Sequence, residues 1–112
     1  MNAYKKYAID HKLPNADKVV TNDPMEATYV GINMWKQAVE KAGSTDVDKV
    51  RAAMAGQSFA APSGYTLTMD AENHHLHKPV MIGQIRADGQ FDVVYKTKDA
   101  IKAEPWSPYI PK

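Results

Sequence analysis

The chain of 112 residues contains no cysteine. That absence excludes a disulfide framework, a zinc site built on thiolates and a cysteine nucleophile. The sequence also lacks any run approaching the roughly 20 apolar residues that a helix needs to cross a bilayer. Residues 1–12 have the pattern of a helix rather than of a signal peptide, so we expect any export signal to be encoded outside this chain.

A strong charge of either sign is missing as well. Lys and Arg together number 14, Asp and Glu number 13, and the charges are scattered, which argues against a nucleic acid or an anionic membrane as partner. The sequence offers no glycine-rich phosphate loop, no nucleophile beside a general base and no paired catalytic carboxylates. We therefore expect no enzyme activity, no catalytic residues and no cofactor. A small neutral ligand or a protein partner fits the composition better.

The clearest local signal that is present marks the start of a helix near residue 23. Asp23 can accept a hydrogen bond as N-cap, and Pro24 suits the first helical position because its missing N–H needs no partner. Glu26 can complete a capping box. Gly43 is typical of a helix end. The sequence therefore predicts a helix between these signals.

This predicted helix carries an apolar stripe at three- or four-residue spacing, formed by Met25, Tyr29, Ile32, Trp35, Val39 and Ala42. Gly31 inside it costs about 1 kcal/mol relative to Ala, and we expect it to pack closely against a backbone outside this chain. Tyr29, Met34 and Trp35 could form an aromatic binding box. Their helical spacing favours the core instead.

Three shorter elements are predicted around this helix. Residues 3–12 predict the end of a helix that stops at residues 13–15, and Val19–Thr21 predict a short strand. A further helix is expected from Ser44 or Thr45 to Gly56, with Asp46 and Asp48 interacting with its N-terminal dipole.

The second half of the sequence favours strands and turns. Residues 61–64 predict a turn, residues 65–69 a strand and residues 70–78 a polar loop. Residues 79–86 and 91–97 flank Asp88-Gly89, a signal for a two-residue type I′ hairpin whose second strand has Phe91, Val93 and Tyr95 on one face. The proline-rich tail from residue 102 predicts an extended segment. An isolated hairpin is marginal in water and the helix stripe needs a sheet beneath it, so these elements indicate part of a larger α/β fold.

Four stretches resemble the C-terminal region of type I periplasmic binding proteins, in the branch that serves ABC importers of urea and short-chain amides. They are LPNADKVVTNDPMEATYVGINMWKQAVEKAG, DVDKVRAAMAGQSFAAPSGYTLTMD, NHHLHKPVMIGQIRADGQFDVV and PWSPYIP. The resemblance implies the C-terminal portion of a two-lobed α/β fold, with two helices and short strands followed by a β-hairpin. It implies that residues 1–77 complete the first lobe. Residues 78–112 would supply a hinge crossing, the hairpin of the second lobe and the tail.

The same resemblance implies a function. A small polar ligand, urea or an amide, is enclosed between the lobes of the full-length protein, which is periplasmic and touches the membrane only through ABC permease subunits. The third crossing between the lobes would be Leu76–Pro79. Most ligand contacts would lie outside this chain, which would hold at most an edge of the pocket.

The predicted ligand-binding residues within this chain are Asp23, Pro24, Met25 and Glu26. They lie where a strand feeds a helix, at the edge of an α/β sheet where clefts form, and free N–H groups of the first helical turn can bind a carbonyl. The alternative is that three of them only cap the helix, while Met25 belongs to the core.

The His-rich stretch raises the question of a metal. His74, His75 and His77 lie near Asp70 and Glu72, but their spacing matches no zinc pattern. We expect a structural loop here and no metal.

Three other functions stay open at this level. The chain could come from a cytoplasmic amide sensor of the same fold, or from a branched-chain amino acid binding protein. It could also be an independent module that forms homo-oligomers by covering its exposed strand edges and helix stripe with a second copy.

Overall fold

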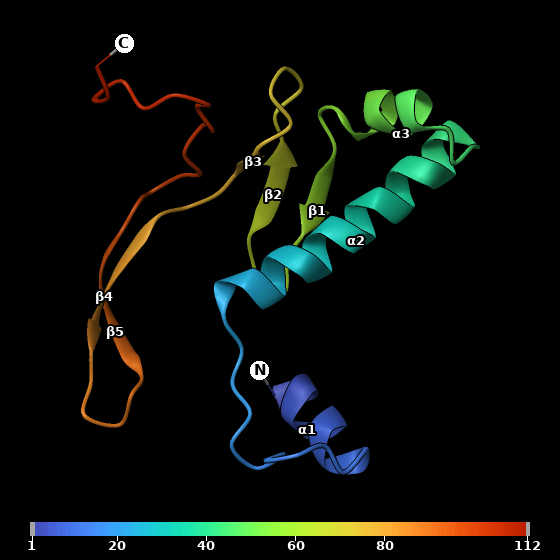
Figure 1. Ribbon diagram of the computed structural model, residues 1–112. Helices are drawn as coiled ribbons and strands as arrows, with labels where there is room; N and C mark the ends of the chain where they lie inside the picture. Colours follow the sequence, from blue (N-terminus) through green and yellow to red (C-terminus); the bar gives the residue numbers. More distant parts are fainter. Residues whose placement is uncertain (1, 112) are drawn as a thin grey trace.

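Helix α2 and the small sheet beside it form the central unit of the computed structural model, which describes residues 2–111 (Figure 1). The elements follow the chain in the order α1 (Asn2–Asp10), α2 (Asp23–Ala42), α3 (Val47–Met54), β1 (Ser58–Ala60), β2 (Thr66–Met69), β3 (Leu76–His77), β4 (Met81–Ile85) and β5 (Phe91–Lys96). None of these helices is long and apolar enough to cross a membrane.

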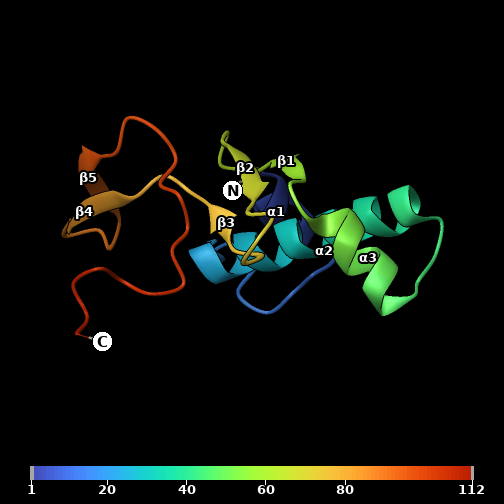
Figure 2. The same ribbon diagram turned by 90° about the horizontal axis from the view of Figure 1, so that it is seen from above.

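The strands form two separate antiparallel sheets. The first has the order β1-β2-β3, and Phe59 pairs with Leu67 while Met69 pairs with Leu76. The second is the hairpin β4-β5. Both views show this hairpin standing apart from the unit formed by α2 and β1–β3, with irregular chain segments running between them (Figures 1 and 2).

The core lies where α2 meets the first sheet and α3. Val30 and Met34 are fully buried and pack with Ala61 and Leu67. One turn further on, Ala38 packs against the buried face of α3, which is formed by Val50 and Ala53. These contacts place one face of α2 on both neighbours.

This chain leaves most of the predicted apolar stripe of α2 uncovered. Tyr29, Ile32 and Trp35 are 53%, 64% and 51% exposed, whereas Met34 is buried as predicted. The helix is apolar on two faces, and the elements of this chain cover only one of them. Gly31 lies on the uncovered part, because a Cβ placed there would meet nothing within 4 Å.

The structure also differs from the sequence-based prediction at three further elements. Val19–Thr21 are not a strand, because no strand among the described residues pairs with them. Strand β1 was not predicted, since three residues carry almost no periodicity and its pairing with β2 defines it. Helix α3 begins at Val47, where the Asp46 carboxylate accepts a hydrogen bond from the Lys49 N–H at 3.1 Å. Asp46 is therefore its N-cap.

The hairpin is present as predicted, but its turn is of another type. A type I′ turn needs positive φ at both central residues, and outside glycine positive φ occurs only at Lys12, Asn15 and His74 within residues 2–111. The Gly89 N–H binds the Arg86 carbonyl, and Gly89 has a φ of 78°. These are the features of a three-residue loop that ends on a left-handed glycine.

A register shift between Ile82 and Gly83 interrupts the hairpin ladder. The predicted alternation of Phe91, Val93 and Tyr95 on one face is therefore broken before Tyr95. All three side chains are more than half exposed.

The chain exposes far more surface than a self-contained domain of its size. Its radius of gyration is 17.2 Å, against about 13 Å expected for a compact domain of this length. Its accessible surface is 8750 Å², against about 6,100 Å² expected. The excess comes from the hairpin, the outer face of α2 and the tail, where Trp106 is 74% exposed.

Candidate functional site

A cleft of about 750 Å³ opens at the N-terminus of α2. Its wall is formed by residues of α1, of the segment that leads into α2, of α2 itself and of the turn before β2, namely Ala3, Tyr4, Thr21, Asn22, Asp23, Met25, Glu26, Tyr29, Pro62 and Ser63. Three of the four predicted ligand-binding residues line it. Pro24 does not.

The capping predicted for this helix start is wrong by one residue. The Asn22 carboxamide oxygen accepts a hydrogen bond from the Met25 N–H at 3.0 Å, so Asn22 is the N-cap and Asp23 is the first helical residue. Glu26 lies one position beyond the capping box and cannot close it. Either Asn22 or Asp23 could have served from sequence alone, since both residue types cap well.

Asp23 and Glu26 form contacts with distant parts of the chain instead. The Lys78 ammonium lies 2.6 Å from Asp23 Oδ1, and Glu26 Oε1 accepts a hydrogen bond from the Ser63 N–H at 2.8 Å. Met25 is 39% exposed, so the elements of this chain do not bury it in their own core. Lys78 and Ser63 lie 55 and 37 residues from their partners. No local sequence signal could have linked them.

Most N–H groups of the first turn are already occupied. Pro24 has none, the Met25 N–H is bound by the Asn22 side chain, and the Glu26 N–H donates to the Asn22 carbonyl at 3.2 Å. Among the residues that the structure describes, this leaves the Asp23 N–H for a ligand carbonyl. Two carboxylates beside it supply acceptors for N–H donors, and Tyr4 and Tyr29 supply apolar ring surface.

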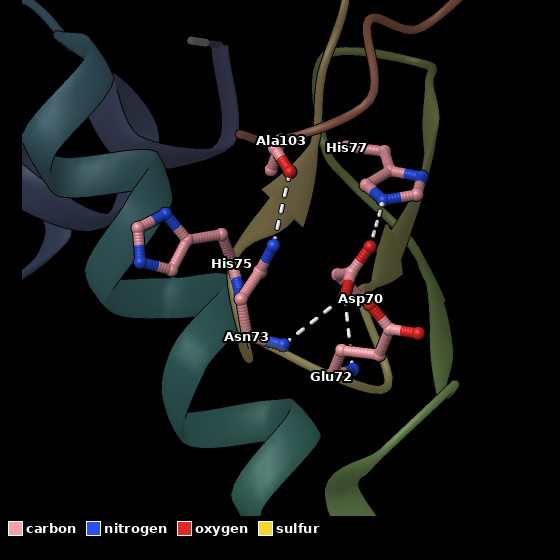
Figure 3. A network of polar contacts seen from close by, with 6 residues as sticks. All are labelled: Asp70, Glu72, Asn73, His75, His77 and Ala103. Atoms are coloured by element: carbon pink, nitrogen blue, oxygen red, sulfur yellow. Dashed lines mark hydrogen bonds and ion pairs between the residues drawn. The ribbon is translucent and has the colours of Figure 1, made fainter. Parts of the chain in front are cut away.

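A second polar cluster lies in the loop between β2 and β3 (Figure 3). Asp70 is buried there, and its Oδ1 accepts hydrogen bonds from the N–H groups of Glu72 and Asn73 at 2.9 and 3.1 Å. Its Oδ2 lies 3.0 Å from His77 Nε2. Asn73 Nδ2 donates to the Ala103 carbonyl at 3.0 Å.

These contacts change the acidity of Asp70. The hydrogen bond from His77, followed by those from the backbone N–H groups of Glu72 and Asn73, lowers the pKa of Asp70 to about 2. Each of them stabilises the ionised carboxylate. The carboxylate is therefore charged throughout the neutral range.

The predicted loop is present over residues 70–75, whereas Leu76 and His77, which were also expected in the loop, form strand β3 by pairing with β2. His77 pairs with Asp70, while His74 Nε2 lies 3.3 Å from the Arg51 carbonyl on α3. The His75 ring points away from the Asp70–His77 pair (Figure 3). No three potential metal ligands gather within residues 2–111.

A second hollow, of about 790 Å³, lies on the tail. It is lined only by residues 104–108 and 110–111, which curl around it. It is apolar and brings together no residues from other elements, so it lacks the convergent polar groups of a ligand site.

An α/β chain with an open, mainly apolar cleft that carries a few polar groups at the start of a helix has the features of a small-ligand binding domain. Residues 2–112 match the family described as the periplasmic binding protein domain. The chain therefore belongs to this family, and its α/β fold is part of the type I periplasmic binding protein fold. Proteins of the family bind small ligands in the periplasm and work with membrane permeases.

The chain is also similar to a much longer curated protein. Over 86 residues it is 40% identical to a protein of Geobacillus stearothermophilus named limonene hydroxylase. The match covers 77% of this chain and 16% of that protein.

Proposed function

We propose that this chain is the C-terminal part of the substrate-binding component of an ABC importer for urea or short-chain amides. In the full-length protein the ligand is enclosed between two lobes and delivered to permease subunits. The family match over residues 2–112 carries the binding role. The resemblance of DPMEATYVG and NHHLHKP to the urea and amide branch supports the ligand class.

The cleft at the N-terminus of α2 supports the same ligand class. Urea and amides carry N–H donors for carboxylates and a carbonyl for a backbone N–H, and Asp23 offers both an acceptor and a free donor. Glu26 adds a second carboxylate. The cleft of about 750 Å³ is far larger than a short amide requires, so residues outside this chain would complete the pocket.

The proposal divides the chain near residue 77. Residues 1–77 complete one lobe, and residues 78–112 form a crossing, the hairpin of the other lobe and the tail. This division agrees with the separate sheets β1-β2-β3 and β4-β5.

The proposal assigns no enzyme activity to this chain. The similar region is a small part of the protein named limonene hydroxylase. Its activity is therefore not transferred.

Calorimetric titration of the full-length protein with urea, acetamide and leucine tests the proposal. We expect saturable binding of urea or acetamide and none of leucine. Binding of leucine alone would favour a branched-chain amino acid receptor, and binding of none of the three would contradict the ligand class. Recovery of the protein in the cytoplasm rather than in the periplasmic fraction would favour an amide sensor.

The variant Glu26→Gln tests the site itself. It keeps the shape and an acceptor for Ser63 but removes the charge, and a hydrogen bond to a charged group is worth about 1.5–3 kcal/mol. We expect roughly 10- to 100-fold weaker binding of the amide. Asp17→Asn, an exposed carboxylate outside the cleft, is the matched control and should leave the affinity unchanged.

A further inference from the structure

Two segments run antiparallel between the first sheet and the hairpin: the outgoing one links β3 to β4, and the returning one leads from β5 back toward the first sheet before the tail. Lys78 pairs with Ile101, whose N–H donates to the Lys78 carbonyl at 2.9 Å. Nearer the hairpin, the Thr97 N–H donates to the Val80 carbonyl at 2.9 Å. Between these two links only Pro79 on the outgoing segment and residues 98–100 on the returning segment are left outside the ladder.

Both segments are attached to the same loop at their ends next to the first sheet. The outgoing segment continues β3, whose Leu76 and His77 pair with β2, and the His77 ring also pairs with Asp70. The returning segment is held by the hydrogen bond from Asn73 Nδ2 to the Ala103 carbonyl (Figure 3). Residues 73 and 103 lie 30 positions apart. The loop of residues 70–77 therefore connects two parts of the chain that are distant in sequence.

Asp70 also orients Asn73. The Asp70 Oδ1 accepts a hydrogen bond from the Asn73 N–H. The Asn73 Oδ1 in turn accepts one from the His75 N–H at 2.9 Å. With its oxygen engaged in this way, the Asn73 amide can only present its N–H₂ group to Ala103. One buried carboxylate thus contacts His77 at the start of the outgoing segment and orients Asn73 toward the returning segment.

The other polar contacts of these segments with the first unit involve long side chains. The Lys78 ammonium pairs with Asp23, their side chains being 31% and 75% exposed, and the ammonium of Lys96 at the end of β5 lies 4.6 Å from the centre of the Tyr65 ring. Exposed ion pairs of this kind hold orientation weakly because two long side chains lose rotamer freedom in water. The loop is the firmer attachment.

We propose that Asp70 and Asn73 are positioning residues that clamp both crossing segments to the first lobe, so that bending between the lobes is confined to Pro79 and residues 98–100. The proposal rests on the proposed function only where it names these segments as crossings between lobes. The clamp moves with the first lobe. The ladder from Val80 onward moves with the hairpin.

The distribution of distances between the two units tests this proposal. Spin labels are placed on α3 at Asp48→Cys and on β4 at Gln84→Cys in the full-length protein, on a background without other cysteines. Asn73→Asp keeps the shape and the acceptor for His75 but turns an oxygen toward the Ala103 carbonyl. We expect the population of detached orientations to rise roughly fivefold, as for the loss of one net hydrogen bond, and Asn73→Ala should act in the same direction.

Asn33→Asp is the matched control. Asn33 also donates from Nδ2 to a backbone carbonyl, that of Tyr29 at 2.7 Å, but within α2. The distance distribution of the Asn33→Asp variant should equal that of the parent protein. Amide exchange in β1–β3 should stay protected in all three variants, which separates a loss of positioning from unfolding. If both Asn73 variants give the distribution of Asn33→Asp, the clamp is refuted.

This outcome is independent of the ligand. A broadened distribution in the Asn73 variants of a protein that binds no amide would keep the clamp and remove the proposed substrate. An unchanged distribution in a protein that binds acetamide would do the reverse.

Discussion

Asp70 is a charged side chain with only 7% of its surface exposed. A buried carboxylate without partners would be strongly destabilising, whereas this one has a histidine and two backbone N–H groups within hydrogen-bond distance. The contacts are local in sequence, from residue 70 to residue 77. At the scale of the residue, they turn a polar stretch into an ordered loop.

The low pKa of Asp70 predicts how stability depends on pH. Its folded value of about 2 lies below its ordinary value of 3.8, so its contribution is complete above about pH 4 and is lost as the pH falls toward 2. Asp70→Asn removes the titrating group. Guanidinium unfolding of the full-length protein should therefore show a difference between parent and variant that is constant at neutral pH and shrinks from pH 4 to pH 2. A difference that does not change with pH would contradict this prediction.

At the scale of the element, α2 is a helix with two apolar faces. Val30, Met34 and Ala38 are fully buried, while Ile32 and Trp35 on the other side are more than half exposed. Hydrophobic periodicity finds such a helix but does not say which face the chain covers. The covered face is the one against which β1, β2 and α3 pack.

The effect of substitutions on α2 and α3 on the free energy of unfolding should depend on whether the side chain lies in the core. Met34→Ala removes a fully buried side chain from the core and should lower the free energy of unfolding by about 2–5 kcal/mol. Val47→Ala on α3, where Val47 is 78% exposed, should change it by less than about 0.5 kcal/mol. Guanidinium unfolding measures both. Equal effects of the two substitutions would show that the core is placed wrongly.

The elements with strong local signals could be predicted from the sequence, and those defined by pairing could not. Gly43 has a φ of 59° and ends α2 as expected, and the hairpin follows from Asp88-Gly89. By contrast, β1 depends on pairing with β2, and Val19–Thr21 lack a partner strand within residues 2–111.

The candidate site, too, could be predicted from the sequence only where its residues give a local signal. Three of its four predicted residues line the cleft, because a helix start is a local signal. Their partners Ser63 and Lys78 come from turns and crossings that only the folded chain brings near.

At the scale of the whole molecule, the apolar surface is the main feature. Both strands of the hairpin are exposed along their full length, and Ile85 and Phe91 are 72% and 60% exposed. A two-stranded sheet of this kind is marginal without a covering layer. The proposed function supplies that layer from the second lobe.

The 112-residue chain produced alone should therefore self-associate. Its hairpin edges and the outer face of α2 would be covered by a second copy. Sedimentation velocity at increasing concentration should show dimers or larger species. A well-folded monomer at all concentrations would contradict this prediction.

The central claim is that this chain belongs to a two-lobed receptor that closes on a small amide. Small-angle X-ray scattering of the full-length protein, with and without saturating urea or acetamide, tests it most directly. Closure of the lobes predicts a smaller radius of gyration when the ligand is bound. An identical radius of gyration with and without both ligands would contradict the claim.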